Sequence, residues 1–198
     1  SPNQGAFVKG RFILENTMIC QDIIKEYNRR AGSPKCIFKL YLQKAYDSIE
    51  WLFLDQMMHA LRFPVGFISK VMACVTTPTY TLALNESQFG YFKGKRGLRQ
   101  GDPISPLLFV ICMEYLTRIL NYAVERWDFN FHPMCKGLIL NHLLFADDLL
   151  LFSKGDASSM TLLLKGFMAF SKSSGLQVSK AKSEVYFSGV NEELKRDL

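Results

Sequence analysis

Two apolar runs that meet at a pair of aspartates constrain the fold of this 198-residue chain more than any other feature. The runs cover 137–145 and 149–152, and only Ala146, Asp147 and Asp148 separate them. Short apolar runs with so brief a connection predict a β-hairpin with the carboxylates at its tip. Two interpretations stay open. The pair forms an exposed turn, where Asp is favoured, or it binds Mg²⁺ or Mn²⁺ beside a further carboxylate, since adjacent buried carboxylates repel one another.

A second strand and the residues that follow it offer a neighbour for that tip. The run at 36–42 predicts a buried strand, apart from Lys39. We expect Asp47 or Ser48 to cap a helix that continues to about residue 62. Tyr46 follows the strand, and it is either a core aromatic or a flat surface beneath a nucleotide sugar.

A glycine-containing basic loop precedes the longest expected helix, 105–126. Gly97 and Gly101 permit close approach of the backbone to a ligand. Positive and amide side chains that could meet phosphate, base or sugar are Lys93, Arg96, Arg99 and Gln100. Asp102 or Ser105 could cap the helix. A polar loop that simply enters a helix is the plain alternative.

The remaining patterns complete a mixed architecture. Helical spacing of apolar residues predicts helices over 11–30, 67–75 and 157–173. Alternation predicts strands over 79–85 and 89–93, which should pair, and a last short strand over 185–187. Strands and helices in this order favour an α+β fold, an antiparallel sheet covered by helices.

Composition narrows the classes of function. About half of the chain is apolar (48%), which excludes a disordered tail, and the net charge of +6 favours an anionic partner. The five cysteines include no C-x-x-C pair, and the three histidines do not cluster with them, so a zinc site is not expected. We find neither a signal peptide nor an apolar run of membrane-spanning length, and expect no membrane partner and an intracellular location, nucleus or cytoplasm.

Taken in order, these motifs resemble a reverse transcriptase of the non-LTR (LINE-type) retrotransposons. KLYLQKAYDSIEW resembles motif A of that family, RGLRQGDPISPLLFVICMEYL motif B, LLFADDLLLF motif C and SGLQVSKAKSE motif D. The N-terminal SPNQGAFVKGRFILENTMICQDII is similar to the segment that enters the fingers. The resemblance implies a right-hand polymerase palm over 36–198, a late fingers segment over 1–35, and an insertion shared by fingers and palm over 76–100. The thumb is expected to be absent.

The resemblance also implies a chemistry, RNA-templated DNA synthesis with two Mg²⁺ (or Mn²⁺) ions. Its partners would be an RNA template, a DNA primer and dNTPs, within a longer polyprotein that carries a thumb and an endonuclease. The roles it implies are metal ligands (Asp147, Asp148), a motif D proton donor (Lys182), nucleotide-pocket residues (Tyr46, Arg99, Gln100, Gly101) and nucleic-acid contacts (Lys93, Arg96).

One departure from the family falls on a metal ligand. Motif A of the family places an aspartate five residues before the aromatic residue, and here that position is Tyr41. A phenol is uncharged at neutral pH and bulkier than a carboxylate. We therefore expect an enzyme by ancestry that is inactive as written, a pseudoenzyme. Two alternatives remain, a working polymerase that tolerates Tyr41, and a non-catalytic module that retains the fold and binds RNA or DNA.

Overall fold

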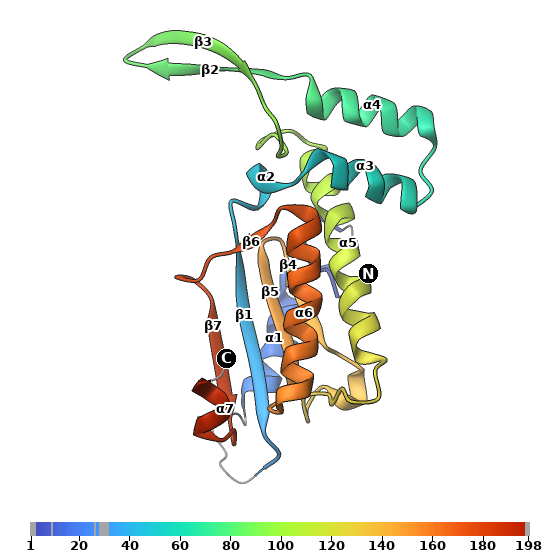
Figure 1. Ribbon diagram of the computed structural model, residues 1–198, viewed down its shortest axis with the longest axis vertical. Helices are drawn as coiled ribbons and strands as arrows, with labels where there is room; N and C mark the ends of the chain where they lie inside the picture. Colours follow the sequence, from blue (N-terminus) through green and yellow to red (C-terminus); the bar gives the residue numbers. More distant parts are fainter. Residues whose placement is uncertain (1–2, 9, 26, 28–31, 197–198) are drawn as a thin grey trace.

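The computed structural model describes residues 3–8, 10–25, 27 and 32–196 of the chain. Its centre is an antiparallel sheet in the order β4-β5-β1-β6, with β7 also paired to β1 (Figure 1). The strands are β1 (Lys35–Gln43), β4 (His142–Phe145), β5 (Asp148–Lys154), β6 (Gln177–Val178) and β7 (Glu184–Ser188). The predicted α+β class is confirmed, and the central strand is the one expected over 36–42.

Side chains of β1 alternate between two apolar layers, as the period of a strand requires. Phe38, Leu40 and Leu42 enter the main core. Ile37 enters a smaller core on the other face. Tyr41 shares the face of Ile37 and Lys39, because all three have odd positions in the strand.

Two long helices cover the main face of the sheet. They are α5 (Ser105–Val124) and α6 (Ala157–Ser174), which pack against each other (Figure 1). By length and composition alone α5 could cross a membrane, which the search for apolar runs missed. Its residues Phe109, Cys112 and Leu120 are nevertheless fully buried in the core. The apolar composition of α5 therefore fits its place at the centre of the molecule.

The other face of the sheet is partly covered by α1 (Ile13–Lys25). Ile23 and Tyr27 belong to the smaller core with β1 and β5. The predicted helix over 11–30 is thus confirmed as far as residue 25, and its expected C-terminal part at 26 and 28–30 lies outside the described residues. A 3₁₀ turn (Lys136–Leu138) precedes β4, and a short α7 (Glu192–Arg196) follows β7.

The helix predicted from Asp47 or Ser48 to residue 62 is wrong as a single element. The structure has α2 (Ala45–Ser48) and α3 (Trp51–Ala60), separated by extended backbone at Ile49 and Glu50, and neither expected cap makes a capping bond. The backbone N–H of Glu50 donates to Ser174 O at 2.9 Å, and Ile49 O accepts from Gly97 N at 2.7 Å. These tertiary hydrogen bonds replace those that a continuous helix would form.

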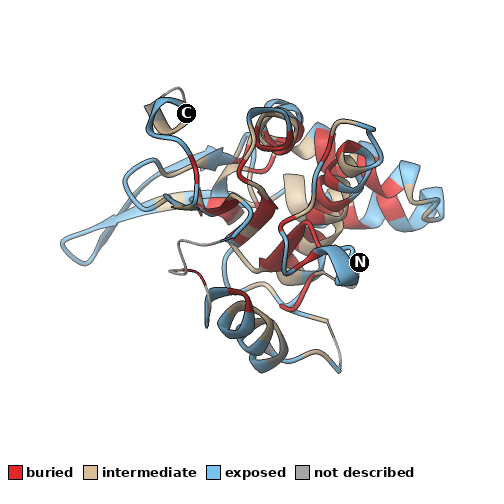
Figure 2. Ribbon diagram, turned by 90° about the horizontal axis from the view of Figure 1, so that it is seen from below, coloured by how far each residue is buried: buried red, intermediate tan, exposed pale blue. Residues whose placement is uncertain are grey.

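A hairpin stands apart from this body. Helix α4 (Val65–Thr76) leads into β2 (Thr79–Leu84) and β3 (Ser87–Lys93), which pair only with each other. The hairpin projects from the end of the molecule where α3 and α4 lie (Figure 1), and nearly all of it is exposed (Figure 2). Both strands and their pairing were predicted from the sequence.

Candidate functional site

The residue in the expected ligand position lies directly beside the carboxylate pair. Tyr41 in β1 and Asp148 in β5 are partners in the antiparallel register. The tip of the β4–β5 hairpin also folds onto β1, because Leu42 N donates to Asp147 O at 3.0 Å. The three residues from two distant parts of the sequence thus meet at one end of the sheet.

The hairpin tip holds Asp147 in a tight turn. Phe145 pairs with Asp148, so Ala146 and Asp147 alone make the connection. Ala146 has φ 51°, in the left-handed region that disfavours residues with a Cβ. Backbone strain of this kind is held in place by the surrounding sheet. The tip therefore presents its carboxylates in a fixed place.

Charge and burial at this end of the sheet raise the pKa of three side chains. A hydrogen bond to Asp147, with the negative charges of Asp147 and Asp148, raises the pKa of the Tyr41 phenol. Burial, followed by the charge of Asp147, raises the pKa of Asp148, and Lys39 partly opposes this. Burial and then Asp147 raise the pKa of Tyr46. The phenol of Tyr41 therefore stays neutral beside Asp147. A carboxylate at position 41 would instead repel Asp147 and Asp148.

Lys182 joins the same group of residues. Its Nζ lies 4.6 Å from the centre of the Tyr41 ring, a cation–π contact. The backbone of Tyr41 is bonded to this segment as well, since Tyr41 O accepts from Ser179 N at 2.8 Å and Tyr41 N donates to Ser183 Oγ at 3.1 Å. Motif D therefore packs along the edge of β1 at position 41.

Tyr46 and the start of α5 form an open pocket of about 430 Å³. The Tyr46 ring stacks on Phe109, with ring centres 5.2 Å apart. The rest of the lining comes from the loop before the helix and includes Gln100 and Gly101. Tyr46 is thus a packed aromatic that also lines a pocket, and its place beneath a nucleotide sugar stays a prediction.

The basic loop is fixed to the palm through its backbone. Gly97 has φ +91°, and a Cβ there would lie 2.8 Å from Asp47 O, so a larger residue would not fit. Trp51 Nε1 donates to Gly97 O at 2.7 Å. The side chains of Arg96 and Arg99 are left exposed, and Arg96 lies 3.5 Å from Glu50.

The loop before α5 departs from its predicted caps. The N-cap position is Ile104, and no side chain caps it. Asp102 Oδ1 accepts instead from the N–H of Ile104 itself at 3.1 Å. Ser105 Oγ donates to Arg99 O at 2.7 Å, which ties the loop to the first turn of the helix.

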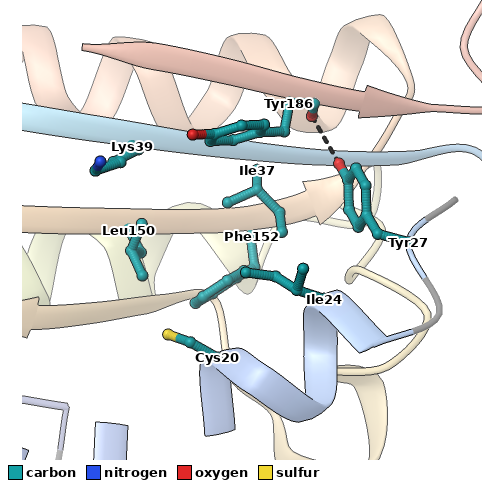
Figure 3. Close-up of a pocket in the computed structure, with 8 residues that line it drawn as sticks. All are labelled: Cys20, Ile24, Tyr27, Ile37, Lys39, Leu150, Phe152 and Tyr186. Atoms are coloured by element: carbon teal, nitrogen blue, oxygen red, sulfur yellow. Dashed lines mark hydrogen bonds between the residues drawn. The ribbon is translucent and has the colours of Figure 1, made fainter. Parts of the chain in front are cut away.

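A separate apolar pocket of about 460 Å³ lies on the face of the sheet that carries Tyr41. Figure 3 shows it between α1 and the strands β1, β5 and β7, with Lys39 at one end. The Tyr27 hydroxyl donates to Tyr186 O across it at 2.7 Å. Leu150 and Phe152 stand two and four residues along β5 from Asp148, so the pocket adjoins the carboxylate end of the sheet.

The structure therefore gathers the predicted residues into two places. Tyr41, Asp147, Asp148 and Lys182 lie together at the end of the sheet. Two pockets carry most of the second set, Tyr46, Arg96, Arg99, Gln100 and Gly101. Lys93 stands at the end of β3 and lines neither pocket. Sequence patterns missed Trp51 and Glu50, because both were expected inside an unbroken helix. The roles of all these residues stay predictions.

Several proteins of retrotransposable elements are similar to this chain. A Pol polyprotein of a type-1 R2 element from Popillia japonica is 29% identical over 72% of the chain, which covers 23% of that protein. The corresponding R2DM protein of Drosophila melanogaster is 27% identical over 83% of the chain and 15% of its own length. The chain thus spans less than a quarter of these relatives.

Solved structures share its fold. Telomerase from Candida albicans, solved with a fragment of telomeric RNA, superposes with a TM-score of 0.66 at 14% identity, over 95% of this chain and 31% of that one. Apo telomerase from Candida tropicalis gives 0.65 at 11% identity, over 96% and 37%. The sequence pattern of one family, described as reverse transcriptase (RNA-dependent DNA polymerase), matches residues 1–195. The resemblance seen in the motifs is therefore confirmed, and the chain belongs to the reverse transcriptase family, of which it holds a partial domain.

Proposed function

We propose that this chain is the palm and late fingers of an RNA-templated DNA polymerase whose nucleotidyl transfer is disabled at Tyr41. The observation that carries the proposal is the register of β1 and β5. It pairs Tyr41 with Asp148, and interaction with Asp147 raises the pKa of the Tyr41 phenol. A residue at position 41 could bind a cation together with both aspartates only if its side chain carried a charged oxygen ligand.

The donor atoms present do not complete a site for two divalent cations. Mg²⁺ and Mn²⁺ prefer several hard oxygen ligands, mainly carboxylates and water. Within the described part of the chain, no three residues among His, Cys, Asp and Glu stand close enough to hold one ion. Asp147 and Asp148 offer two carboxylates, and Tyr41 offers only a phenol, whose pKa Asp147 raises further. We therefore derive no catalytic step through a metal ion in this chain.

The remaining site residues support a retained nucleotide and template surface. In this proposal Tyr46 lies beneath the sugar of the incoming dNTP, and Gln100 and Gly101 line the pocket for base and template. Arg96 and Arg99 meet phosphates. Lys182 has the place of a proton donor to pyrophosphate, but here its ammonium group rests on the Tyr41 ring. The domain bounds of 1–35 and 36–198, and the longer parent polyprotein, belong to the same proposal.

Primer extension on an RNA template tests the proposal. The chain would be joined to the fingers and thumb of a related element, in its own form and as Tyr41→Asp, with that element's intact polymerase as positive control. Tyr41→Phe is the matched control, because it removes the hydroxyl without adding a charge. We expect product from Tyr41→Asp only. Equal product from the unaltered chain would refute the disabling role of Tyr41.

A second function is favoured by a specific feature, the exposed positive charge beside the pockets. Lys93, Lys95, Arg96 and Arg99 all lie at the surface within a single loop region. A non-catalytic module that binds RNA or DNA through them would need no divalent cation, and its affinity would fall with salt. Measurement of nucleic-acid affinity in EDTA, over a range of salt concentrations, tests this function without reference to synthesis.

A further inference from the structure

One face of the β2–β3 hairpin is apolar along its whole length, although no described part of the chain covers it. The register pairs Tyr80 with Phe92, Leu82 with Phe89 and Leu84 with Ser87. Cross-strand partners share a face of the ladder, so the apolar side chains of both strands gather on one side. Their exposed fractions are 37% for Tyr80, 64% for Leu82, 64% for Leu84, 55% for Phe89 and 51% for Phe92.

The opposite face of the same hairpin is more polar, although Ala83 lies on it and Tyr91, next to Phe92 in the strand, is 83% exposed. Thr79 pairs there with Lys93, and Ala83 pairs with Gln88. Figures 1 and 2 show the hairpin extended away from the sheet, with its ribbon almost entirely exposed. An isolated two-stranded hairpin is marginally stable in water. A hairpin with one apolar and one more polar face therefore indicates a surface that is covered when a partner binds.

The base of the hairpin is held in place by the palm. A Cβ on Gly94 would lie 3.2 Å from the Tyr80 ring and 3.4 Å from the Trp51 ring, so the backbone runs close beneath both rings. The rings of Tyr80 and Phe92 stack with centres 5.8 Å apart. Since Trp51 is itself bonded to Gly97 O at 2.7 Å, this aromatic pair is fixed relative to the basic loop.

Aromatic rings and positive charges share one open pocket of about 510 Å³. Its lining includes Tyr80 and Phe92 from the hairpin, and Arg96 and Arg99 from the loop. Gln100 also lines it, and Gln100 belongs as well to the adjoining pocket that holds Tyr46. The two pockets therefore meet at Gln100, between Tyr46 on one side and the base of the hairpin on the other.

Charge selects the class of partner. From 76 to 101 the chain has four basic residues and one acidic residue, Glu86, which lies at the far turn of the hairpin. The pocket lining adds one further carboxylate, Asp47, which accepts from Gln100 Nε2 at 3.2 Å. Aromatic rings that stack on bases, beside cations that meet the phosphates, are the combination that binds unpaired nucleic acid without sequence preference. A protein partner could cover the same apolar face, but the arginines beside that face favour an anionic partner.

We propose that Tyr80 and Phe92, with Arg96 and Arg99, form a stacking platform for unpaired template RNA as it approaches the palm. The platform rests on the proposed function for the choice of RNA and for the direction of its approach. Unpaired bases stack on the two rings, and the flanking phosphates contact the arginines. Leu82, Leu84 and Phe89 extend the apolar surface for further bases toward the tip.

Fluorescence anisotropy with the chain as it exists tests the platform. The probe is a labelled uridine oligonucleotide of about 12 residues, in EDTA, and an abasic oligonucleotide of the same length is the second probe. We expect Tyr80→Ser/Phe92→Ser to weaken binding of the uridine probe by about tenfold or more. The slope of log affinity against log salt should not change, because no phosphate contact is lost. The abasic probe should bind the unaltered chain as weakly as the uridine probe binds the variant.

Matched variants keep the result interpretable. Tyr80→Phe/Phe92→Tyr preserves both rings and should bind like the unaltered chain, as should Thr81→Ala/Gln88→Ala away from the apolar face. Arg96→Gln/Arg99→Gln should reduce the salt slope by about two. Equal binding by the double Ser variant would overturn the platform. A double Ser variant that changes only its sedimentation coefficient, with unchanged RNA binding, would also overturn the platform. That result would assign the apolar face to protein contacts.

The platform and the proposed function can fail separately. The binding measurement needs no metal ion and no DNA synthesis. None of its variants replaces Tyr41, Asp147 or Asp148. Hairpin-dependent RNA binding by a chain whose Tyr41→Asp form makes no product would refute the disabling role of Tyr41 alone. Product from the Tyr41→Asp form, with binding that ignores Tyr80 and Phe92, would refute the platform alone.

Discussion

In the described part of the chain, two antiparallel hairpins carry similar apolar side chains in opposite surroundings. The β4–β5 hairpin lies inside the sheet, and its Leu144, Leu149 and Leu151 are almost fully buried. The β2–β3 hairpin has the same kind of apolar side chains, but they face solvent. Alternation in a sequence therefore predicts a strand and its apolar side, whereas what covers that side depends on the rest of the fold or on a partner.

The largest expected difference between the hairpins is in stability. Leu149→Ala in β5 should lower the free energy of unfolding by about 2–5 kcal/mol, because it leaves a cavity among fully buried side chains. Leu82→Ala in β2 should change it by less than about 0.5 kcal/mol, because that side chain is exposed. Urea unfolding of both variants measures the two values. Similar losses for the two would show that the β2–β3 hairpin is packed in solution.

A second difference concerns pH. His142 in β4 is fully buried, and burial lowers its pKa to about 3. Burial likewise lowers the pKa of His132, which stacks on Tyr27, to about 4. Both histidines are neutral in the folded state and take up protons on unfolding near their ordinary value of 6.5. Their contribution to stability is thus complete above pH 6.5 and is lost as pH falls toward these lowered values.

The corresponding measurement is the free energy of unfolding at about pH 7.5 and about pH 5. We expect lower stability at the acidic value, and the protection factors of the β4–β5 amides should then be smaller. His59→Gln is the control, since His59 lies half exposed on α3. The β2–β3 hairpin has no histidine. The exchange rate of its amides should therefore change with pH only as the intrinsic exchange rate of an amide does. A stability that is the same at both pH values would contradict the buried neutral histidines.

The smallest expected difference lies in the turns. Ala146 has φ 51° at the tip of β4–β5, and Asn85 and Glu86 have φ 48° and 64° at the tip of β2–β3. Glycine adopts such angles without steric cost. Ala146→Gly should therefore raise the free energy of unfolding by up to about 1 kcal/mol. Glu86→Gly should slow amide exchange within β2–β3 alone, because global unfolding does not depend on that hairpin.

Most elements of the fold followed from periodicity, and the failures have a common cause. The strand over 36–42, the β2–β3 hairpin and the helix that ends before Gly175 were predicted from local pattern. The break at Ile49–Glu50 was not, because it depends on hydrogen bonds to Ser174 O and from Gly97 N, which are distant in the sequence. The uncovered apolar face of β2–β3 was not predicted either, since alternation alone does not reveal exposure.

The features of the candidate site also divide into those that the sequence predicted and those that depend on tertiary contacts. The motifs selected Asp147, Asp148 and Lys182, and the family spacing selected Tyr41 as the altered position. The contact of Lys182 with the Tyr41 ring and the hydrogen bond from Leu42 N to Asp147 O could not be predicted, because they depend on the placement of three separate segments. Trp51, which fixes the basic loop, gave no signal in the sequence beyond its helical surroundings.

The most direct test of the account is Mn²⁺ binding measured by calorimetry for the unaltered chain, Tyr41→Asp and Tyr41→Phe. Tyr41→Asp adds a charged oxygen ligand opposite Asp148 and removes the ring beneath Lys182. The account predicts clearly tighter binding for Tyr41→Asp than for the other two forms, which should resemble each other. Equal affinity for all three forms would contradict the claim that position 41 shares a metal site with Asp147 and Asp148.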